Sequence, residues 1–440
     1  MIEVQRNRLI WPVAIAIVLR LALLAATLLR TGTTVITSGD TASYLEPGHN
    51  LIFHGSFVTR ILPEIDRTPG YPIFLAIVSL PGVAFAAFAQ VLFSAFTVLL
   101  IWRLARAIFA DERIALISAW LFAFEPVSTI YSVRLLPETL YLVLLLLSLE
   151  RLVVFLRDRL LISLAAAGLW LAAATFVRPV SYYLPVALAL GLLVVSVRVP
   201  GLRWKAPAVL LMSTLPWLAA WQIRNKVETG FSGFSSIVAR NLYFYQAAEV
   251  EARVEHRPFA QVQKEFGYPD EQSYISHHPD QSEWPQARRV AFMSAEAARV
   301  LRAHPATYLK MHLEGSVVVA FTPCVADLAR LLGAYPENAP RRVVSEGPVT
   351  AALLLVTTHP WLTALMVVFE IVLLTLYLLA LRGLLASRIK REVIWLLLGV
   401  FLYFMAVSGG AQAVGRYRLP VMPIVCIFAA AGWRRNPITG

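Results

Sequence analysis

Residues 83–108 read VAFAAFAQVLFSAFTVLLIWRLARAI, and no charged residue precedes Arg103 in this run. A helix needs about 20 mostly apolar residues to cross the hydrocarbon core of a bilayer. Inside that core each backbone N–H and C=O must find a partner, and a helix provides one within its own segment. The run therefore predicts a membrane-spanning helix and directs the search to similar runs elsewhere in the chain.

Nine further runs are apolar enough to be helices of the same kind. The ten predicted spans are 9–30, 83–108, 113–132, 138–156, 160–177, 179–198, 206–223, 360–381, 392–408 and 418–433, each within a few residues. Of the 440 residues, 58% are hydrophobic and 15% are charged, whereas soluble domains carry roughly 45–50% and about 25%. We therefore expect an all-α polytopic membrane protein of about ten transmembrane helices.

Basic residues set the orientation of these helices. With the N-terminus in the cytoplasm, every inward-facing loop is basic; these loops hold Arg103, Arg106, Arg113, Arg151, Arg157, Arg159, Arg198, Arg203, Lys205, Arg382, Arg388, Lys390, Arg391, Arg434 and Arg435. Cytoplasmic loops beside an anionic leaflet show this excess of Lys and Arg. The net charge of +12 is spread over short loops and forms no single stripe, so we expect the lipid bilayer and no nucleic acid as a partner.

This topology divides the chain into three parts. Residues 1–223 are expected to form an N-terminal transmembrane module with a long first outer loop at 31–82. Its apolar run 71–80 is too short to span, so juxtamembrane helices are predicted there. Residues 224–358 show helical periodicity and predict a mostly helical extracytoplasmic domain. Residues 359–440 are expected to hold the C-terminal transmembrane helices.

Asp40 lies in the first outer loop, a few residues outside the membrane, and Tyr44 follows it by one helical turn. A carboxylate at the mouth of a helix bundle can act as a general base. The alternative is a helix N-cap, because Ser38-Gly39-Asp40-Thr41 is favourable chemistry for a helix start. The local sequence taken alone favours the cap.

Several arginines lie on the outer side, where the charge rule disfavours them. They are Arg67, Arg178, Arg224, Arg416 and Arg418. A guanidinium is the preferred bidentate partner of phosphate, so several at one depth predict a site for a lipid phosphate. Each one singly could instead extend its charge to the headgroups. Their shared side of the membrane favours the common phosphate site.

Glu138 opens the predicted helix 138–156 on the same side. It could position a sugar hydroxyl or a second cation, although a glutamate in the first turn after a proline is also ordinary helix-dipole chemistry. The histidines and two cysteines show no metal-ligand spacing, so no metal site is predicted. The sequence requires no cofactor, and a divalent metal is left open.

At these residues the sequence resembles the GT-C superfamily of membrane glycosyltransferases. The resemblance is greatest to the bacterial branch related to dolichyl-phosphate-mannose protein mannosyltransferases and the lipid A aminoarabinose transferase. Its carriers, in order, are Gly39-Asp40, the stretch RTPGYP at 67–72, Glu138, FVRP at 176–179, WQIRN at 221–225, HPATYL at 304–309 and GRYRLP at 415–420. Where eukaryotic mannosyltransferases carry an Asp-Glu pair, this chain has Asp40-Thr41. Where the aminoarabinose transferase has a lysine, it has Arg67.

The resemblance implies an inverting glycosyltransferase that uses a polyprenyl-phosphate sugar donor, of the undecaprenyl-phosphate type in bacteria. The acceptor would be a glycan, a lipid or a protein on the periplasmic side of the inner membrane. Asp40 would be the catalytic base, and Arg67, Arg178 and one of Arg416 and Arg418 would bind the leaving phosphate. Arg224 joins the predicted phosphate site by its side of the membrane. The residues expected to line the sugar and acceptor cavity are Tyr44, Tyr71, Glu138, Asn225 and Tyr417.

Two other functions use the same outer-face arginines. A flippase or transporter of polyprenyl-phosphate sugars would bind the phosphate without chemistry, and it should show internal repeats and helices broken at mid-membrane. A glycan polymerase or ligase would typically rely on a large outer loop with Arg or His. The Asp40 position and the lack of a clear repeat favour the glycosyltransferase.

Overall fold

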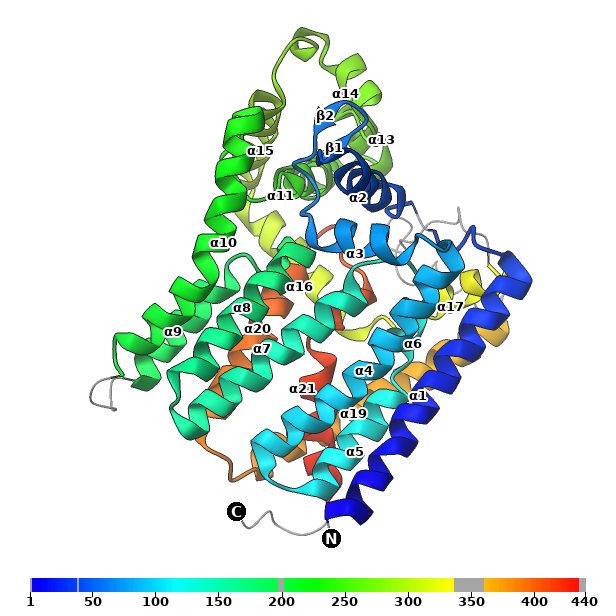
Figure 1. The fold of residues 1–440 in the computed structure, drawn as a ribbon. Coiled ribbons are helices and arrows are strands. Elements are labelled where there is room, and N and C mark those ends of the chain that lie inside the picture. Colours follow the sequence, from blue (N-terminus) through cyan, green and yellow to red (C-terminus); the bar gives the residue numbers. More distant parts are fainter. Residues whose placement is uncertain (1, 38, 197–201, 336–359, 435–440) are drawn as a thin grey trace.

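The computed structural model describes residues 2–37, 39–196, 202–335 and 360–434. Arg198, Arg435, residues 336–358 of the predicted extracytoplasmic domain, and residues 359 and 436–440 lie outside the described residues. Within them the secondary structure is helical, apart from a two-stranded hairpin of β1 (Val58–Thr59) and β2 (Leu62–Pro63). The predicted all-α membrane protein is confirmed (Figure 1).

Each of the ten predicted spans coincides with an apolar helix or helix pair. The helices are α1 (Ile2–Thr31), α4 (Val83–Phe109), α5 (Glu112–Ala123), α6 (Pro126–Val133), α7 (Glu138–Asp158), α8 (Leu161–Val177), α9 (Leu184–Ser196), α10 (Lys205–Thr229), α19 (Pro360–Ala386), α20 (Arg391–Ser408) and α21 (Met422–Trp433). Among the described residues, α1, α4, α7, α10, α19 and α20 are long and apolar enough to span alone, and α5 with α6 makes a seventh candidate. The remaining helices, α8, α9 and α21, are shorter. Hydropathy located all of them; it placed α8 to within one residue and began α9 and α21 four or five residues too early.

The seventh candidate span is bent by 53° between α5 and α6. Pro126 lacks an N–H and so starts a new helix there, while the Glu125 side chain accepts a hydrogen bond from the Ser128 N–H. The guanidinium of Arg20, which is fully buried in α1, donates to Ser94 Oγ, Ser128 Oγ and the Ala123 carbonyl. The mid-span arginine therefore satisfies the polar groups that the break exposes.

The first outer loop holds α2 (Ala42–His54), the hairpin and α3 (Gly70–Val78). Helix α3 is the juxtamembrane helix predicted at 71–80, and it packs on α2, α4 and α8. A Cβ on Gly70 would lie 2.7 Å from the Phe176 carbonyl carbon and oxygen and 2.9 Å from the Val177 nitrogen. The first outer loop can thus approach the end of α8 only because residue 70 has no side chain.

Gly70→Ala is expected to destabilise the protein by about 1–3 kcal/mol, the usual cost of an overpacked contact. The backbone of Phe176 cannot rotate away as a side chain could. Gly191→Ala in α9 is the matched control, because a Cβ there meets nothing within 4 Å. That change should be neutral or stabilise by about 0.5–1 kcal/mol. Thermal unfolding of the detergent-solubilised proteins compares the two, and equal melting temperatures would contradict the prediction.

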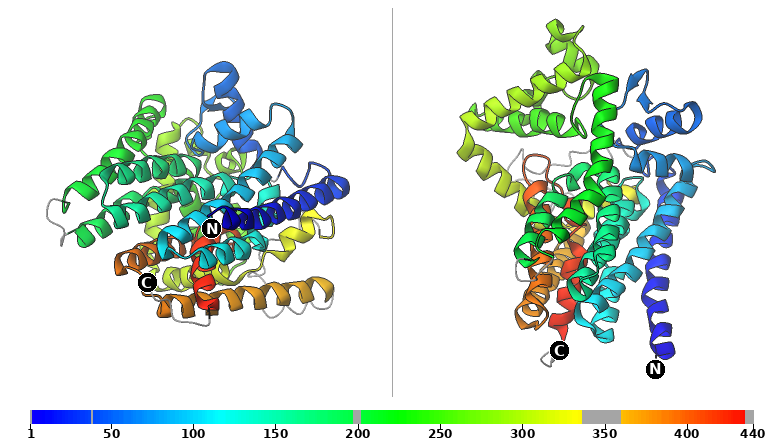
Figure 2. Two further views of the ribbon diagram at one scale, coloured as in Figure 1. Left: turned by 60° about the horizontal axis from the view of Figure 1, so that its bottom comes forward. Right: turned by 60° about the vertical axis from the view of Figure 1, so that its left-hand side comes forward.

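The domain predicted to be extracytoplasmic stands over the end of the bundle opposite the termini (Figure 2). It contains α11 (Ile237–Asn241), a π-helical turn η2 (Leu242–Ala247), α12 (Ala248–Val254), α13 (Phe259–Glu265), α14 (Glu271–His277), η3 (Pro279–Gln281) and α15 (Gln286–Ala303). Its core includes Tyr243, Phe244 and Tyr274. Helix α16 (Pro305–Phe321) returns the chain to α20 in the bundle, and α17 (Val325–Leu331) packs on α19.

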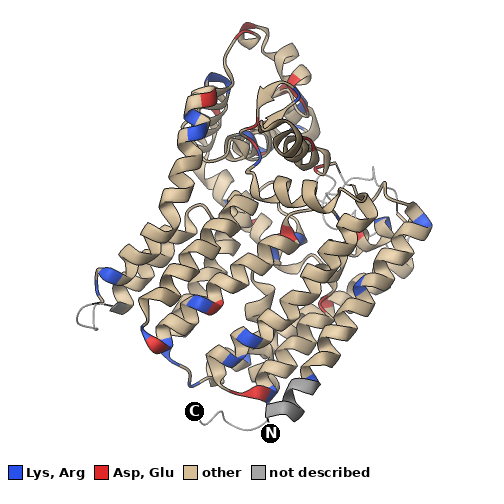
Figure 3. Ribbon diagram, viewed as in Figure 1, with Lys and Arg blue, Asp and Glu red and all other residues tan. Residues whose placement is uncertain are grey.

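Charged residues follow the predicted orientation along the bundle. Lys and Arg gather at the end of the bundle that holds both termini, and further charges lie in the domain at the opposite end (Figure 3). Between the two ends the helices are nearly free of charge. The basic loops and the first outer loop therefore lie on opposite sides of the apolar layer, as the charge rule predicts.

Candidate active site

Asp40 lies between α1 and α2, at the end of the bundle that faces the extracytoplasmic domain. Its Oδ1 lies 3.2 Å from Nη2 of Arg67, and its Oδ2 lies 3.8 Å from Nη2 of Arg416. The N-cap residue of α2 is Thr41, which makes no side-chain capping hydrogen bond. The carboxylate of Asp40 is thus directed to two guanidinium groups from opposite ends of the chain.

Arg67 is held in place by the loop that precedes α3. The backbone N–H groups of Asp66 and Arg67 donate to Oε1 of Glu64, at 2.6 and 2.8 Å, which fixes the turn. Its guanidinium donates to Ser43 Oγ and to the Tyr44 hydroxyl, both at 3.1 Å, and lies 4.4 Å from the Tyr44 ring centroid. Burial opposes its charge, but Tyr44, Asp40 and nearby carboxylates outweigh burial and raise its pKa.

Glu138 joins two further arginines. Its Oε1 lies 3.5 Å from Nη1 of Arg178, at the end of α8, and 3.5 Å from Nε of Arg416, in the 3-10 turn η4 (Gly415–Arg418). The Tyr417 ring lies beside both guanidiniums, with its centroid 5.7 and 5.4 Å from their carbons. Burial opposes the charge of Arg416, but Glu138, Tyr417, Tyr131 and Asp40 hold its pKa well above the usual value.

Five residues thus form one connected group, which we call the arginine–carboxylate cluster: Arg67, Asp40, Arg416, Glu138 and Arg178. They come from the first outer loop, the start of α7, the end of α8 and η4, so the fold brings together positions that are remote in sequence. Three cations against two anions leave one positive charge. The cluster can therefore bind an anion, and it offers several N–H donors to it.

Three of the predicted cavity residues are tyrosines that pack beside the cluster or behind it. Tyr44 and Tyr417 contact cluster guanidiniums. Tyr71 lies behind Tyr44, edge to face at 5.0 Å between centroids, is fully buried, and donates to Gln90 Oε1 at 2.6 Å. Burial raises the pKa of the Tyr44 phenol, while Arg67 beside it lowers it. Tyr71 therefore supports the cluster residue Arg67 through Tyr44.

Three predicted residues lie outside the cluster. The guanidinium of Arg224 donates to the carbonyls of Phe57 and Glu64, both at 2.8 Å, and so ties α10 to the first outer loop. Asn225 donates to the Gly233 carbonyl at 2.9 Å. The buried Arg418 donates to the Thr322 carbonyl. The structure uses these side chains to satisfy backbone carbonyls and does not bring them to Asp40.

Arg224→Ala is expected to lower the free energy of unfolding by about 1–3 kcal/mol, because two carbonyls lose a charged donor. Lipid-phosphate affinity should stay within about twofold of the wild type, which is less than a third of the 1.4 kcal/mol that tenfold represents. Lys226→Ala, at an exposed position of the same helix, is the matched control and should change neither property. Thermal unfolding and lipid binding measured on one preparation separate the two effects. A large loss of affinity at unchanged stability would instead place Arg224 in the phosphate site.

The comparisons with known proteins bear on the fold. Residues 69–229 match the family model described as dolichyl-phosphate-mannose-protein mannosyltransferase. An oligosaccharyltransferase of Archaeoglobus fulgidus, tethered with an acceptor peptide containing the NVT sequon, superposes with a TM-score of 0.50 at 15% identity, covering 96% of this chain and 49% of that one. The chain therefore shares its fold with that oligosaccharyltransferase.

Two further structures superpose less closely. The archaeal oligosaccharyltransferase AglB, in complex with an inhibitory peptide and a dolichol-phosphate, gives a TM-score of 0.49 at 14% identity, covering 95% of this chain and 50% of that one. ArnT from Cupriavidus metallidurans bound to undecaprenyl phosphate gives 0.41 at 13% identity, covering 96% and 77%. The chain spans about half the length of the two oligosaccharyltransferase chains. No curated protein sequence matches it.

Two features of the candidate site escaped sequence reasoning. Tyr131 lies beside Arg416, with its ring centroid 5.8 Å from the guanidinium carbon, and donates to Asp327 Oδ2 at 2.7 Å. Tyr245 of the π-helical turn donates to the Tyr268 hydroxyl at 3.0 Å; burial, then Tyr268, Tyr417 and Asp40, raise its pKa. Tyr245, in the domain predicted to be extracytoplasmic, therefore lies close enough to Asp40 for the two groups to interact electrostatically. A π-helical turn, often found at functional sites, has no spacing signal in the sequence.

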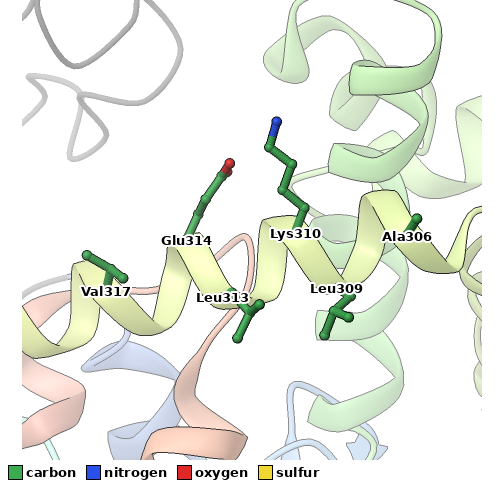
Figure 4. A pocket seen from close by; sticks show the side chains of 6 residues that line it. All are labelled: Ala306, Leu309, Lys310, Leu313, Glu314 and Val317. Carbon is green, nitrogen blue, oxygen red and sulfur yellow. The ribbon is translucent and has the colours of Figure 1, made fainter.

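The described structure has two pockets near or beside the candidate site, and neither holds a group of metal ligands. A small cavity beside Glu138 is lined by Ser94, Thr97, Ser128, Tyr131, Glu138, Thr139, Leu142 and Leu419. An open pocket of about 470 Å³ runs along α16, where Lys310 and Glu314 point to one side, and it holds no cluster residue (Figure 4). No group of three or more His, Cys, Asp or Glu within the described ranges could hold a metal ion.

Proposed function

We propose that the protein is an inverting glycosyltransferase that transfers a sugar from a polyprenyl-phosphate donor, of the undecaprenyl-phosphate type, to a glycan, lipid or protein acceptor. The observation that carries this proposal is the placement of Asp40 within 4 Å of two arginines of a three-arginine group. A transferase of this kind needs a base beside a phosphate site, and the GT-C fold supports the same class of reaction.

The three cluster arginines are suited to the leaving phosphate. Displacement at the anomeric carbon builds negative charge on the phosphate oxygen, so fixed guanidiniums beside it stabilise the transition state more than the ground state. Arg178 and Arg416 are fixed by Glu138, and Arg67 is fixed by Ser43 and Tyr44. A membrane-embedded donor also explains how the reaction proceeds without a nucleotide-binding domain in the described chain.

Asp40 is suited to the base. Its side chain is 46% exposed, whereas that of Glu138 is 2% exposed, so an acceptor can reach Asp40. The acceptor oxygen bonds to the anomeric carbon while its proton passes to the Asp40 carboxylate. The bond from that carbon to the phosphate oxygen breaks, and its electron pair stays on the phosphate. The products are the glycosylated acceptor and the polyprenyl phosphate, with the anomeric configuration inverted.

The proposed location follows from the charge pattern. The cluster lies at the end of the bundle opposite the basic loops, so the cluster would face the periplasm of a bacterial inner membrane. The family model that matches residues 69–229 names a dolichyl-phosphate sugar. That range includes Glu138 and Arg178, while Asp40, Arg67 and Arg416 lie outside it. The family description therefore supports a lipid-phosphate sugar as the donor class.

The donor is tested by mass spectrometry of lipid-linked sugars in cells that lack the protein. A polyprenyl-phosphate sugar should accumulate there and decline when the wild-type gene is restored. The purified protein in proteoliposomes should then release polyprenyl phosphate from that donor. A protein that only moves the lipid across the bilayer would leave the phosphate–sugar bond intact, and that outcome would replace the transferase by a transporter.

A further inference from the structure

The two carboxylates of the arginine–carboxylate cluster differ in how they are held. Glu138 is buried in the first turn of α7, and one of its oxygens, Oε1, lies 3.5 Å from both Arg178 and Arg416. Asp40 is half exposed, lies on a turn, and contacts Arg67 and Arg416 with separate oxygens at 3.2 and 3.8 Å. The two side chains carry the same charge but occupy different environments.

Moving Glu138 would be costly. Withdrawing a buried carboxylate from two guanidiniums would leave uncompensated charges in a low-dielectric interior. Its second oxygen, Oε2, is buried without a hydrogen-bond partner in the described structure and borders the small cavity beside Ser94 and Thr139. Glu138 thus gives up part of its own hydrogen bonding while it orients two arginines.

Moving Asp40 would cost little. Its carboxylate is 46% exposed, so water can solvate it when it leaves the two guanidiniums, and an incoming phosphate can take its place beside them. Among its described interactions, Asp40 faces Arg67 from the first outer loop, Arg416 from η4, Tyr44 from α2 and Tyr245 from the domain predicted to be extracytoplasmic, which are cations or phenols. The second carboxylate of the cluster, Glu138, shares Arg416 with it. A phosphate that entered this space would therefore meet the same donors that Asp40 now contacts.

We propose that the two carboxylates have opposite roles toward the donor: Asp40 competes with its phosphate for Arg67 and Arg416, whereas Glu138 is a positioning residue that holds Arg178 and Arg416. The inference rests on the lipid-phosphate donor of the proposed function and adds the competition to it. The incoming phosphate displaces Asp40 from the guanidiniums, and the released carboxylate is then a stronger base toward the acceptor hydroxyl.

The competition also bears on product release. After transfer Asp40 carries the acceptor's proton and no longer attracts the arginines, so the polyprenyl phosphate keeps them. Once Asp40 passes that proton to water, its carboxylate again competes for Arg67 and Arg416. The same group therefore promotes departure of the lipid phosphate in each cycle.

Two charge-matched variants test the inference. Asp40→Asn and Glu138→Gln each remove one negative charge and keep the size of the side chain. Net charge alone predicts that both bind lipid phosphate more tightly. The proposal predicts opposite signs: tighter by about tenfold for Asp40→Asn, and weaker by about tenfold for Glu138→Gln, where tenfold is about 1.4 kcal/mol. The probe is undecaprenyl monophosphate, and its equilibrium binding is measured with the full chain in nanodiscs.

Further variants keep the test decisive. Glu46→Gln, an exposed carboxylate of α2 that contacts the Arg60 backbone, should leave affinity unchanged. Arg67→Gln should reduce the gain caused by Asp40→Asn, because the two anions then compete for one arginine fewer; this cycle does not depend on the folding of Glu138→Gln.

Each outcome has a distinct meaning. Unchanged or weaker binding by Asp40→Asn overturns the competition. Tighter binding by folded Glu138→Gln overturns its positioning role. If undecaprenyl phosphate bound to none of the proteins, the wild type included, the donor class in the proposed function would fail instead.

Discussion

Asp40→Asn is expected to lower the rate of sugar transfer by about 10²–10⁴-fold, the contribution of a positioned general base. Asparagine keeps the shape of the side chain but cannot take the acceptor's proton. Folding and lipid-phosphate binding should persist, because Arg67 retains Ser43 and Tyr44 as partners and Arg416 retains Glu138. The rate of polyprenyl phosphate release from the donor that accumulates in deletion cells measures the effect.

The control for Asp40→Asn is Glu46→Gln, which removes a carboxylate from the same outer loop without touching the cluster. It should keep the wild-type rate. Asp40→Asn protein that transferred sugar at a near wild-type rate would show that another group accepts the proton. Glu138 is the remaining carboxylate of the cluster and would become the next candidate.

Arg416→Gln is expected to lower the turnover rate by about 10²–10³-fold, comparable to the loss of one preorganised donor to a developing oxyanion. Arg416 is the one residue that contacts both Asp40 and Glu138 among the described ion pairs. Its loss removes charge from the phosphate site and leaves Glu138 with Arg178 alone. Arg416→Lys should restore part of the rate, since a lysine keeps the charge but not the bidentate fork.

Arg418 provides the contrast for Arg416, because it lies in the same 3-10 turn but donates to the Thr322 and Val319 carbonyls. Arg418→Lys should lower the melting temperature more than the lipid-phosphate affinity. Thermal unfolding and undecaprenyl phosphate binding are measured for both positions. If Arg416→Gln lost only stability, while its turnover per folded molecule stayed unchanged, Arg416 would be a structural residue and not part of the phosphate site.

The sequence predicted the bundle well because each membrane-spanning helix requires an apolar run of neighbouring residues, which can be seen without knowing the fold. Each span is a contiguous run, and the run 83–108 coincides with α4 to within one residue. The bend at Glu125-Pro126 and the short helices α9 and α21 were less predictable. Their lengths depend on packing against neighbours, since a helix surrounded by protein need not match the thickness of the lipid.

The sequence named side chains of the candidate site, but it could not show which of them contact one another. Outer-face arginines look alike in sequence, yet Arg224 and Arg418 bind carbonyls while Arg67, Arg178 and Arg416 meet carboxylates. Which of these a guanidinium meets depends on contacts between separate elements of the fold, which spacing within one motif cannot reveal. For the same reason, the bridge from Glu138 to two arginines appears only in the structure.

The cluster has a consequence for how the protein is made. Asp40 and Arg67 are synthesised early, whereas Arg416 follows α20 and reaches the outer face only after nearly every helix has been inserted. Because chains are inserted from the N-terminus onward, a nascent chain would hold the base and one arginine without the group that joins them to Glu138. The arginine–carboxylate cluster would then be complete only in the last step of membrane insertion. Under the proposed function, a half-inserted chain would not consume lipid-linked sugar.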